Sequence, residues 1–315
     1  TADYFYKRTE GMLQVMPVPT YLGESKPWGN VGEMSNRGIE LDMNYRYSIG
    51  DFNFSIGANA TYIKTILINA GNETGILDGG SFHQMGTITR GQNGMVYPYF
   101  YGYKTDGVFQ NWDEVNSYVG ADGSLIQPSA QPGDFRYKDL DGDGKITAEG
   151  DRTNLGKCVP AWTYGVNASI DWKGIDFSMV WQGVAGNKIF DGTRRTDIPT
   201  MNQPKYVLNR WTGEGSTNAY PRFTTTDPNQ NWSKASDFFI KDASYFRLKN
   251  ITLGYTLPYN WTKKVFVKKL RVYVAAENLL TLTKYDGFDP EIAGYMDRGI
   301  YPQARTFQFG ASITF

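Results

Sequence analysis

Three aspartates alternate with other residues near the middle of the chain, in a segment that reads DLDGDGKIT over residues 139–147. Carboxylates at the first, third and fifth positions of such a loop can converge on a hard cation, and glycine at the sixth permits a sharp turn. We therefore expect a structural Ca²⁺ site whose ligands are Asp139, Asp141, Asp143 and the main-chain carbonyl of Lys145. The twelfth position is Gly150, where EF-hand loops carry glutamate, so Asp151 is the expected remaining carboxylate, with Glu149 as the alternative.

A second explanation of the same segment needs no metal. Aspartate side chains in turns accept hydrogen bonds from the backbone two residues further on, and this segment has the composition of a polar turn. Mg²⁺ fits the segment less well than Ca²⁺, because it demands a regular octahedral set of ligands.

Aromatic and amide side chains are frequent in the long segments on either side of this loop. Flat rings stack on sugar faces or pack against peptide side chains, so such residues could line a substrate cavity. The candidates are Trp112, Trp211, Trp232, Tyr206 and Tyr220, accompanied by Asn202, Asn229 and Asn231. The alternative is that these side chains pack one long loop against another.

Other chemistries find little support in the sequence. A single histidine, His83, and a single cysteine, Cys158, exclude disulfide frameworks and metal centres built from several imidazoles or thiolates. Basic and acidic side chains number 32 each, which argues against a nucleic-acid partner, because phosphate binding leaves a basic footprint. We also expect no enzyme: the carboxylates that could form a glycosidase pair alternate with apolar residues and are better explained as lining a wet lumen. These are Glu40, Asp42, Asp171, Asp176 and Glu277.

The elements that must position these residues are strands, because apolar residues recur at every second position and helical spacing is almost absent. Alternating runs cover 39–48, 52–62, 162–172 and 175–181. The first three reach the roughly 9–11 residues of a tilted membrane-spanning strand, whereas strands of soluble proteins usually have about 5–6. Aromatic rings also gather near the tight turns at 49–50 and 173–174, as in the girdles of membrane barrels. The pattern favours an all-β, transmembrane antiparallel β-barrel over a soluble β-sandwich.

The direction of the last strand orders the others. Residues 304–315 alternate up to Phe315, and a closing aromatic is common in barrels of the bacterial outer membrane. With Phe315 at the periplasmic rim, long extracellular loops fall at 111–158, 190–243 and 284–303, and a phase slip at Lys249-Asn250 predicts a bulge. About ten strands result, near 2–16, 39–48, 52–62, 82–91, 96–110, 162–172, 175–181, 244–257, 269–283 and 304–315.

Several distinctive strings then resemble the C-terminal part of a SusC/RagA-type TonB-dependent outer-membrane transporter of the Bacteroidetes. They are DYFYKRTEGML (3–13), MSNRGIELDMNY (34–45), YFYGYKTDGVFQN (99–111), PGDFRYKDLDGDGKI (132–146), WTYGVNASIDWKGIDFSMVWQGVAGNKIF (162–190), YFRLKNITLGYTLP (245–258), LRVYVAAENLLTLTKYDGFDPE (270–291) and YPQARTFQFGASITF (301–315). The resemblance therefore extends over nearly all of residues 1–315.

This resemblance implies energy-dependent import of oligosaccharides or peptides across the outer membrane of a Gram-negative cell. It also implies outer-membrane lipid around the barrel, a SusD-like surface lipoprotein as a lid, and the TonB complex as energy source. Such transporters have about 22 strands around a plugged lumen. Because the chain starts at Thr1 without a methionine or signal peptide, we expect it to be part of a longer protein whose plug domain and TonB box lie elsewhere.

Two other functions stay open at this stage. A secreted, Ca²⁺-stabilised β-sandwich that binds carbohydrate would be soluble without detergent. A structural or adhesive outer-membrane barrel would transport nothing, so deletion of its gene would leave uptake unchanged.

Overall fold

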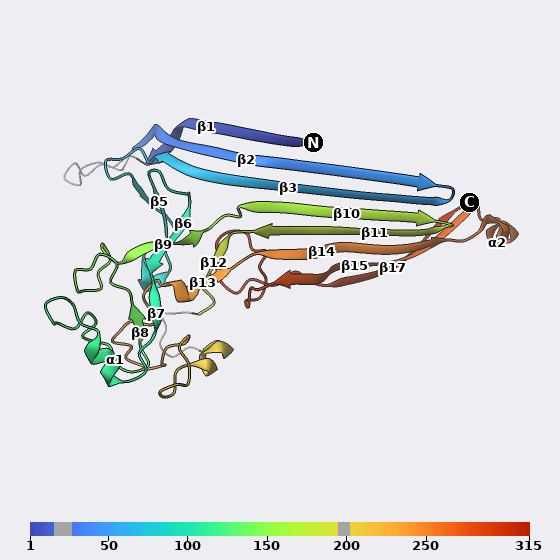
Figure 1. The fold of residues 1–315 in the computed structure, drawn as a ribbon. Helices are drawn as coiled ribbons and strands as arrows, with labels where there is room; N and C mark the ends of the chain where they lie inside the picture. The colour runs from blue at the N-terminus through green and yellow to red at the C-terminus, as the bar shows by residue number, and fades with distance from the viewer. Residues whose placement is uncertain (16–26, 195–201) are drawn as a thin grey trace.

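The computed structural model describes residues 1–15, 27–194 and 202–315. Its dominant feature is one antiparallel sheet of eight strands in the order β1-β2-β3-β10-β11-β14-β15-β17 (Figure 1). Within the described ranges, β1 and β17 form the two edges of this sheet. The strands are β1 (Ala2–Val15), β2 (Trp28–Ile49), β3 (Phe52–Asn69), β10 (Trp162–Trp172), β11 (Ile175–Ala185), β14 (Tyr245–Thr256), β15 (Lys269–Thr283) and β17 (Thr306–Thr314).

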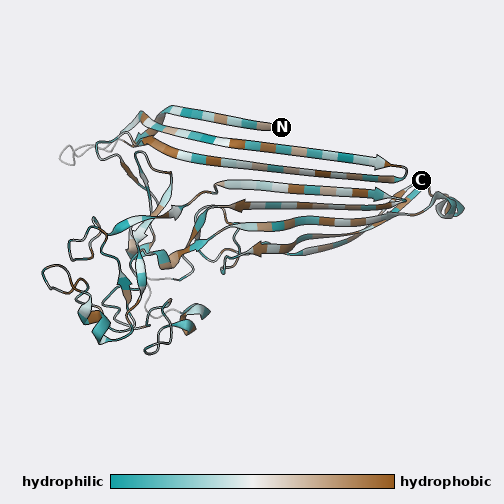
Figure 2. Ribbon diagram, viewed as in Figure 1, coloured by the Kyte–Doolittle hydropathy of each residue, from teal (hydrophilic) through white to brown (hydrophobic). Residues whose placement is uncertain are grey.

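The period-two sequence pattern explains these strands, because successive side chains of a strand point to opposite faces. Hydropathy alternates along most of their length (Figure 2). Register places like with like across the pairs: Phe54 lies opposite Ile170, and Ser55 opposite Ser169, with their hydroxyl oxygens 2.8 Å apart. The sheet consequently has one apolar and one polar face, as the sequence predicted.

The prediction that two further barrel strands occupy 82–91 and 96–110 is wrong. Strand β3 pairs directly with β10, from Phe52 opposite Trp172 to Tyr62 opposite Trp162. Residues 70–161 form a single excursion between these two neighbours, and its strands are short: β5 spans Thr89–Gln92 and β6 spans Tyr99–Tyr103. Because residues 70–161 leave the sheet after β3 and return to it at β10 on the same side, every other strand keeps its predicted direction. The two extra membrane-spanning strands were therefore not needed to explain those directions.

The bulge predicted at Lys249-Asn250 is confirmed. Val180 and Trp181 are consecutive in β11, yet they pair with Asn250 and Leu248 of β14, so Lys249 is the extra residue. The pairing of β14 with β15 shifts at the same place. A bulge of this kind bends the strand and redirects the extra side chain.

Chain connections differ greatly between the two ends of the sheet. At one end, here called the turn end, β2–β3 and β10–β11 are joined by two-residue turns, while β14–β15 is joined by helix α2 (Tyr259–Thr262) and the 3₁₀ turn η5 (Lys263–Val265). At the other end lie the described parts of 70–161, 186–244 and 284–305, which fold together into one mass (Figure 1). We call this mass the outer lobe.

The outer lobe has its own small sheets and core. Its sheets are β4-β5-β6-β9, β13-β12-β16 and β7-β8, where β4 is Ile76–Asp78, β7 Thr105–Val108, β8 Phe135–Tyr137, β9 Arg152–Lys157, β12 Lys188–Asp191, β13 Ile240–Asp242 and β16 Met296–Asp297. Its helical elements are η2 (His83–Met85), α1 (Trp112–Ser117), η3 (Lys205–Asn209) and η4 (Asp237–Phe239). The largest core cluster brings together residues of two segments. Phe82 and Phe100 come from 70–161, and Phe190, Trp232 and Phe239 come from 186–244. Within the ranges described, no helix has the length and apolar character needed to cross a membrane.

Candidate functional site

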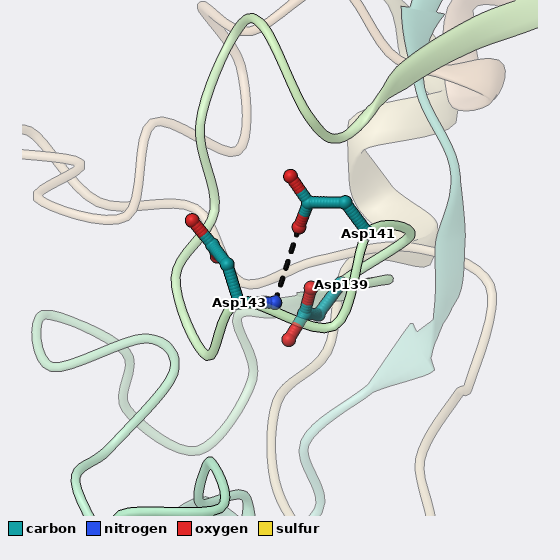
Figure 3. A group of neighbouring side chains, drawn as sticks. All are labelled: Asp139, Asp141 and Asp143. Atoms are coloured by element: carbon teal, nitrogen blue, oxygen red, sulfur yellow. Dashed lines mark hydrogen bonds between the residues drawn. The ribbon is translucent and has the colours of Figure 1, made fainter.

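The predicted metal loop lies in the outer lobe and gathers three carboxylates. Oxygen atoms of Asp139, Asp141 and Asp143 lie within 4.8 Å of one another (Figure 3). Each also serves a turn: Asp139 accepts hydrogen bonds from the amides of Gly142 and Gly144 at 2.8 and 2.9 Å. The Asp143 amide donates to Asp141 at 3.2 Å. Both explanations drawn from the sequence therefore describe compatible features of one loop.

The remaining expected ligands have different environments. Asp151 is fully buried, and its two oxygens accept hydrogen bonds of 2.6 Å from the amides of Leu140 and Thr147, so it ties the two arms of the loop together. The amide of Lys145 donates to Asp143 at 2.9 Å. Gly150 lies close to the carboxylate of Asp141: a Cβ there would lie 2.0 Å from an oxygen of Asp141, so a glutamate at position twelve would require that side chain to move.

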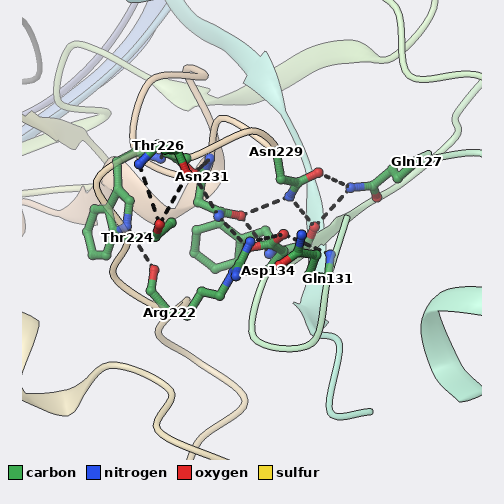
Figure 4. A network of polar contacts seen from close by, with 11 residues as sticks. Gln127, Gln131, Asp134, Arg222, Thr224, Thr226, Asn229 and Asn231 are labelled. Carbon is green, nitrogen blue, oxygen red and sulfur yellow. Dashed lines mark hydrogen bonds and ion pairs between the residues drawn. The ribbon is translucent and has the colours of Figure 1, made fainter. Parts of the chain in front are cut away.

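Three of the aromatic and amide candidates are buried in loop-to-loop packing. Trp232 is 3 % exposed, and its indole N–H donates to the carbonyl of Arg222 at 3.1 Å. Asn229 and Asn231 belong to a polar network that joins the backbone around β8 to the segment 222–231 (Figure 4). The amide nitrogen of Asn231 donates at 2.8 Å to Asp134, which is also bonded by Arg222 at 2.6 Å. These side chains hold the outer lobe together.

Two other tryptophans have different surroundings, and Trp211 packs against the core cluster of Val108, Phe135 and Tyr137. Trp112 is 55 % exposed at the start of α1, a short helix that Asn111 caps by accepting the amide hydrogen of Glu114 at 3.0 Å. The indole N–H of Trp211 donates to Gln110 at 3.2 Å. Asn202 is exposed.

Tyr206 and Tyr220 are the candidates that the structure brings together around a cavity. Their ring centroids are 6.2 Å apart, and both line a cavity of about 550 Å³ in the outer lobe. Asp191 and Asp286 also line it, together with the exposed side chains of Phe288 and Leu208. Burial, together with the negative charge of Asp191, raises the pKa of Tyr206. The cavity combines π faces, apolar surface and hydrogen-bond acceptors.

A buried cluster of charges that we did not predict as a site positions one wall of this cavity. Arg247 of β14 is 3 % exposed and donates to Asp289 at 2.6 Å and to Glu291 at 2.7 Å, while Lys249, the bulge residue, donates to Glu291 at 2.7 Å. The cluster fastens the segment 284–303, which carries the cavity residues Tyr285, Asp286 and Phe288, to the barrel wall. The phase slip at Lys249 was the available sequence signal.

The other titratable residues considered from sequence have structural surroundings. Cys158 is buried in the core of the outer lobe, and burial raises the pKa of its thiol, which makes it a poor nucleophile. His83 lies in η2 with its ring 4.2 Å from that of Phe82. Asp176 forms an ion pair with Arg271 at 2.5 Å on the sheet.

Comparisons with known proteins agree with this architecture. Residues 1–173, more than half of the chain, match the family described as "TonB dependent receptor-like, beta-barrel". TonB-dependent receptor P3 of Formosa agariphila is 30 % identical over 99 % of this chain and 32 % of its own length. TonB-dependent receptor SusC of Bacteroides thetaiotaomicron is 25 % identical over 99 % of this chain and 30 % of its own length.

Solved structures share the fold. A chain of the RagAB peptide transporter superposes with a TM-score of 0.77 at 23 % identity, over 100 % of this chain and 33 % of that chain. The present chain thus spans about a third of the length of these relatives. As the resemblance predicted, the chain belongs to the TonB dependent receptor-like β-barrel family, is of the SusC/RagA type, and contributes its long sheet to a barrel of the outer membrane.

Proposed function

We propose that the full-length protein imports an oligosaccharide or a peptide across the outer membrane, with TonB as the source of energy and a SusD-like surface lipoprotein as its lid. The plug domain and TonB box belong, in this proposal, to parts of the protein outside residues 1–315. Membership of the TonB-dependent receptor family is the observation that carries the proposal. The outer lobe adds support, because a barrel that served only as a membrane anchor would not need a folded mass with its own core and a cavity at one end.

The cavity lined by Tyr206 and Tyr220 is the substrate contact that we propose. Binding sites are concave, mostly apolar and furnished with a few polar groups, and this cavity has aromatic rings beside the carboxylates of Asp191 and Asp286. The buried cluster around Arg247 holds one wall in place, so little ordering would be required on binding. Trp112 and Trp211 remain proposed contacts outside this cavity, and Trp232 would act by supporting the lobe.

We further propose that Ca²⁺ occupies the loop 139–151 and stiffens the outer lobe. Three carboxylates that approach within 4.8 Å repel one another, and a cation between them would relieve that repulsion. Asp139, Asp141, Asp143 and the carbonyl of Lys145 would hold the ion, whereas Asp151 would act mainly through its two backbone hydrogen bonds.

The experiment compares uptake in cells that lack the gene with uptake in cells complemented by the full-length protein. Labelled oligosaccharides and peptides are offered with TonB present and absent. Import that requires both the gene and TonB supports the proposal; uptake that is unchanged by the deletion favours a structural or adhesive barrel.

The cavity is tested in the same cells with the double variant Tyr206→Ala/Phe288→Ala. We expect uptake to fall at least about ten-fold, corresponding to about 1.4 kcal/mol, while the amount of protein in the outer membrane is unchanged. Tyr301→Ala removes an exposed ring of the same lobe that does not line the cavity, and serves as the control. Equal losses for both variants would refute the assignment of the cavity.

A further inference from the structure

The connection between β14 and β15 presents large apolar side chains at the turn end of the sheet. Tyr259, Trp261, Val265 and Phe266 are 61, 63, 66 and 90 % exposed. The connection extends beyond the ends of the neighbouring strands (Figure 1). Four such residues within eight positions are unusual for a turn in water, where exposed apolar patches commonly mark an interaction surface.

A defined backbone fold presents these side chains. Thr262 is 3 % exposed, its hydroxyl donates to the carbonyl of Tyr259 at 3.3 Å, and its carbonyl accepts from the amide of Val267 at 3.2 Å. Phe266 adopts a left-handed conformation with φ of 59°, which is uncommon for a bulky residue. Both ends of the connection are fixed to the sheet, because the amide of Leu257 donates to the carbonyl of Leu270 at 2.9 Å and the amide of Lys268 to the carbonyl of Thr314 at 2.8 Å.

Positive charge surrounds the apolar residues. Residues 257–270 contain Lys263, Lys264, Lys268 and Lys269 and no aspartate or glutamate. The neighbouring turn adds Lys173, whose ammonium lies 5.6 Å from the ring centroid of Trp172. The acidic residues that share a hollow with Lys173 and Lys269 at this end of the sheet are Asp51, Asp171 and Asp176, and the last is already paired with Arg271. The connection therefore keeps a net positive charge.

The location of the connection indicates which surface it meets. It continues from the apolar sheet face at Tyr255 and Val272, which line a groove with Leu253 and Phe309. In outer-membrane barrels, short turns lie on the periplasmic side, and aromatic residues mark the level of the lipid headgroups. Lysines placed beside exposed aromatic residues at that level combine apolar insertion with attraction for negative charge.

We propose that the connection 257–269 is a binding site for anionic phospholipid headgroups of the periplasmic leaflet. The rings of Trp261 and Phe266 insert between acyl chains at the interface, and Lys263 and Lys264 contact lipid phosphates. Clusters of four or more basic residues beside a membrane segment bind acidic lipids in this way, and each lysine contributes about a five-fold gain in affinity.

Native mass spectrometry of the purified full-length protein tests the proposal. The protein is incubated with palmitoyl-oleoyl phosphatidylglycerol or with the zwitterionic phosphatidylcholine of the same chains, and the retained lipids are counted. We expect at least about ten-fold more phosphatidylglycerol than phosphatidylcholine on the wild-type protein, and a decline of this preference as the ammonium acetate concentration rises. Equal retention of the two lipids by the wild-type protein would overturn the proposal without recourse to any variant.

Two double variants locate the site. Lys263→Gln/Lys264→Gln should lower the preference for phosphatidylglycerol at least about five-fold. Lys205→Gln/Lys284→Gln, which neutralises two exposed lysines in the outer lobe, should leave it unchanged. An unaltered preference in the first variant, or an equal loss in both, would refute the assignment and would point to other basic residues or to a protein partner at this connection. Uptake is not measured, so the outcome is independent of the import proposal.

Discussion

Aspartates of the loop 139–151 show how residues of one type differ once their surroundings are known. Asp141 is exposed and accepts one hydrogen bond of 3.2 Å, whereas Asp151 is fully buried and accepts two of 2.6 Å. From their spacing in the sequence, we predicted that both aspartates bind the same Ca²⁺ ion. The difference between them comes from the position of residues 147–151 against the rest of the loop, which no local pattern reveals.

Two substitutions should therefore have different effects on the loop. Asp151→Ala leaves the amides of Leu140 and Thr147 without their partner, and each lost hydrogen bond to a carboxylate costs about 1.5–3 kcal/mol. We expect rapid proteolysis of the loop with or without Ca²⁺. Asp141→Ala should instead remove only the protection that Ca²⁺ confers, when limited proteolysis in Ca²⁺ is compared with proteolysis in chelator.

The control for this pair is Asp113→Ala, an exposed aspartate of α1 outside the loop. It should behave as the wild-type protein in both conditions. If Ca²⁺ gives the wild-type loop no protection, the metal proposal fails, while the prediction for Asp151 stands.

The Arg247 cluster leads to a second prediction about single residues. Arg247→Leu leaves Asp289 buried without its charged partner, and loss of one member of a buried ion pair costs about 3–5 kcal/mol. We expect proteases to cut the segment 284–303 in this variant while the barrel still migrates as a folded, heat-modifiable species. Arg247→Leu/Asp289→Leu removes both charges and should recover much of the lost protection.

The same cluster has a defined response to pH. Burial alone would raise the pKa of Asp289, but the hydrogen bonds from Arg247 and from the amides of Gln303 and Glu291 outweigh it and lower the pKa. A lowered pKa stabilises the folded state above the unfolded value of about 3.9, and this contribution is lost as the pH falls through the folded value. Protection of 284–303 should thus be the same at pH 7 and pH 5 and decline only in stronger acid; a decline between pH 7 and pH 5 would contradict this assignment.

Strands are the scale at which the sequence was most informative. Side chains alternate at every second position along β10, so Val166 and Asn167 are neighbours in the chain and belong to opposite faces of the sheet. Arginine at the lipid-facing midplane of a barrel costs about 2–4 kcal/mol. We expect Val166→Arg in the full-length protein to reduce the amount assembled in the outer membrane, and Asn167→Arg to assemble normally. Equal assembly of the two variants would show that the faces are assigned wrongly.

The same regularity explains what the sequence predicted and what it did not. Alternation and strand direction together predicted the eight strands of the sheet, although β2 was predicted over 39–48 and extends over Trp28–Ile49. One interrupted alternation predicted the bulge at Lys249. Segments 82–91 and 96–110 also carry many apolar and aromatic residues, but Phe82, Tyr99 and Phe100 are buried in the outer lobe. The cavity at Tyr206 and the Arg247 cluster depend on contacts between residues more than forty positions apart, or between separate excursions, which no periodicity records.

At the scale of the whole molecule, the short turns and the outer lobe lie at opposite ends of the sheet. The orientation of the sheet across the outer membrane can therefore be tested. Cys158 is buried, with a raised thiol pKa, so the wild-type chain should not react with a membrane-impermeant maleimide on intact cells. A cysteine at Asn116, exposed in the outer lobe, should react. A cysteine at Lys264, exposed at the turn end, should react only after the outer membrane is permeabilised.

Reaction of the Lys264→Cys variant on intact cells, together with no reaction at Asn116→Cys, would mean that the sheet crosses the membrane in the opposite direction. The amount of each variant in the outer membrane is measured in parallel, so that a lack of labelling reflects access rather than abundance.

Direct pairing of β3 with β10 also has a consequence for how such proteins diversify. These strands pair from Phe52 opposite Trp172 to Tyr62 opposite Trp162 without any residue of the excursion between them, and doubling the length of a flexible loop costs only about 0.6 kcal/mol in closure entropy. Insertions, deletions and exchanges of segments between Asn69 and Trp162 therefore leave the membrane-embedded wall unchanged while they remodel the surface presented to the environment. Gene duplication followed by recombination at these two boundaries would place different outer lobes on one barrel wall.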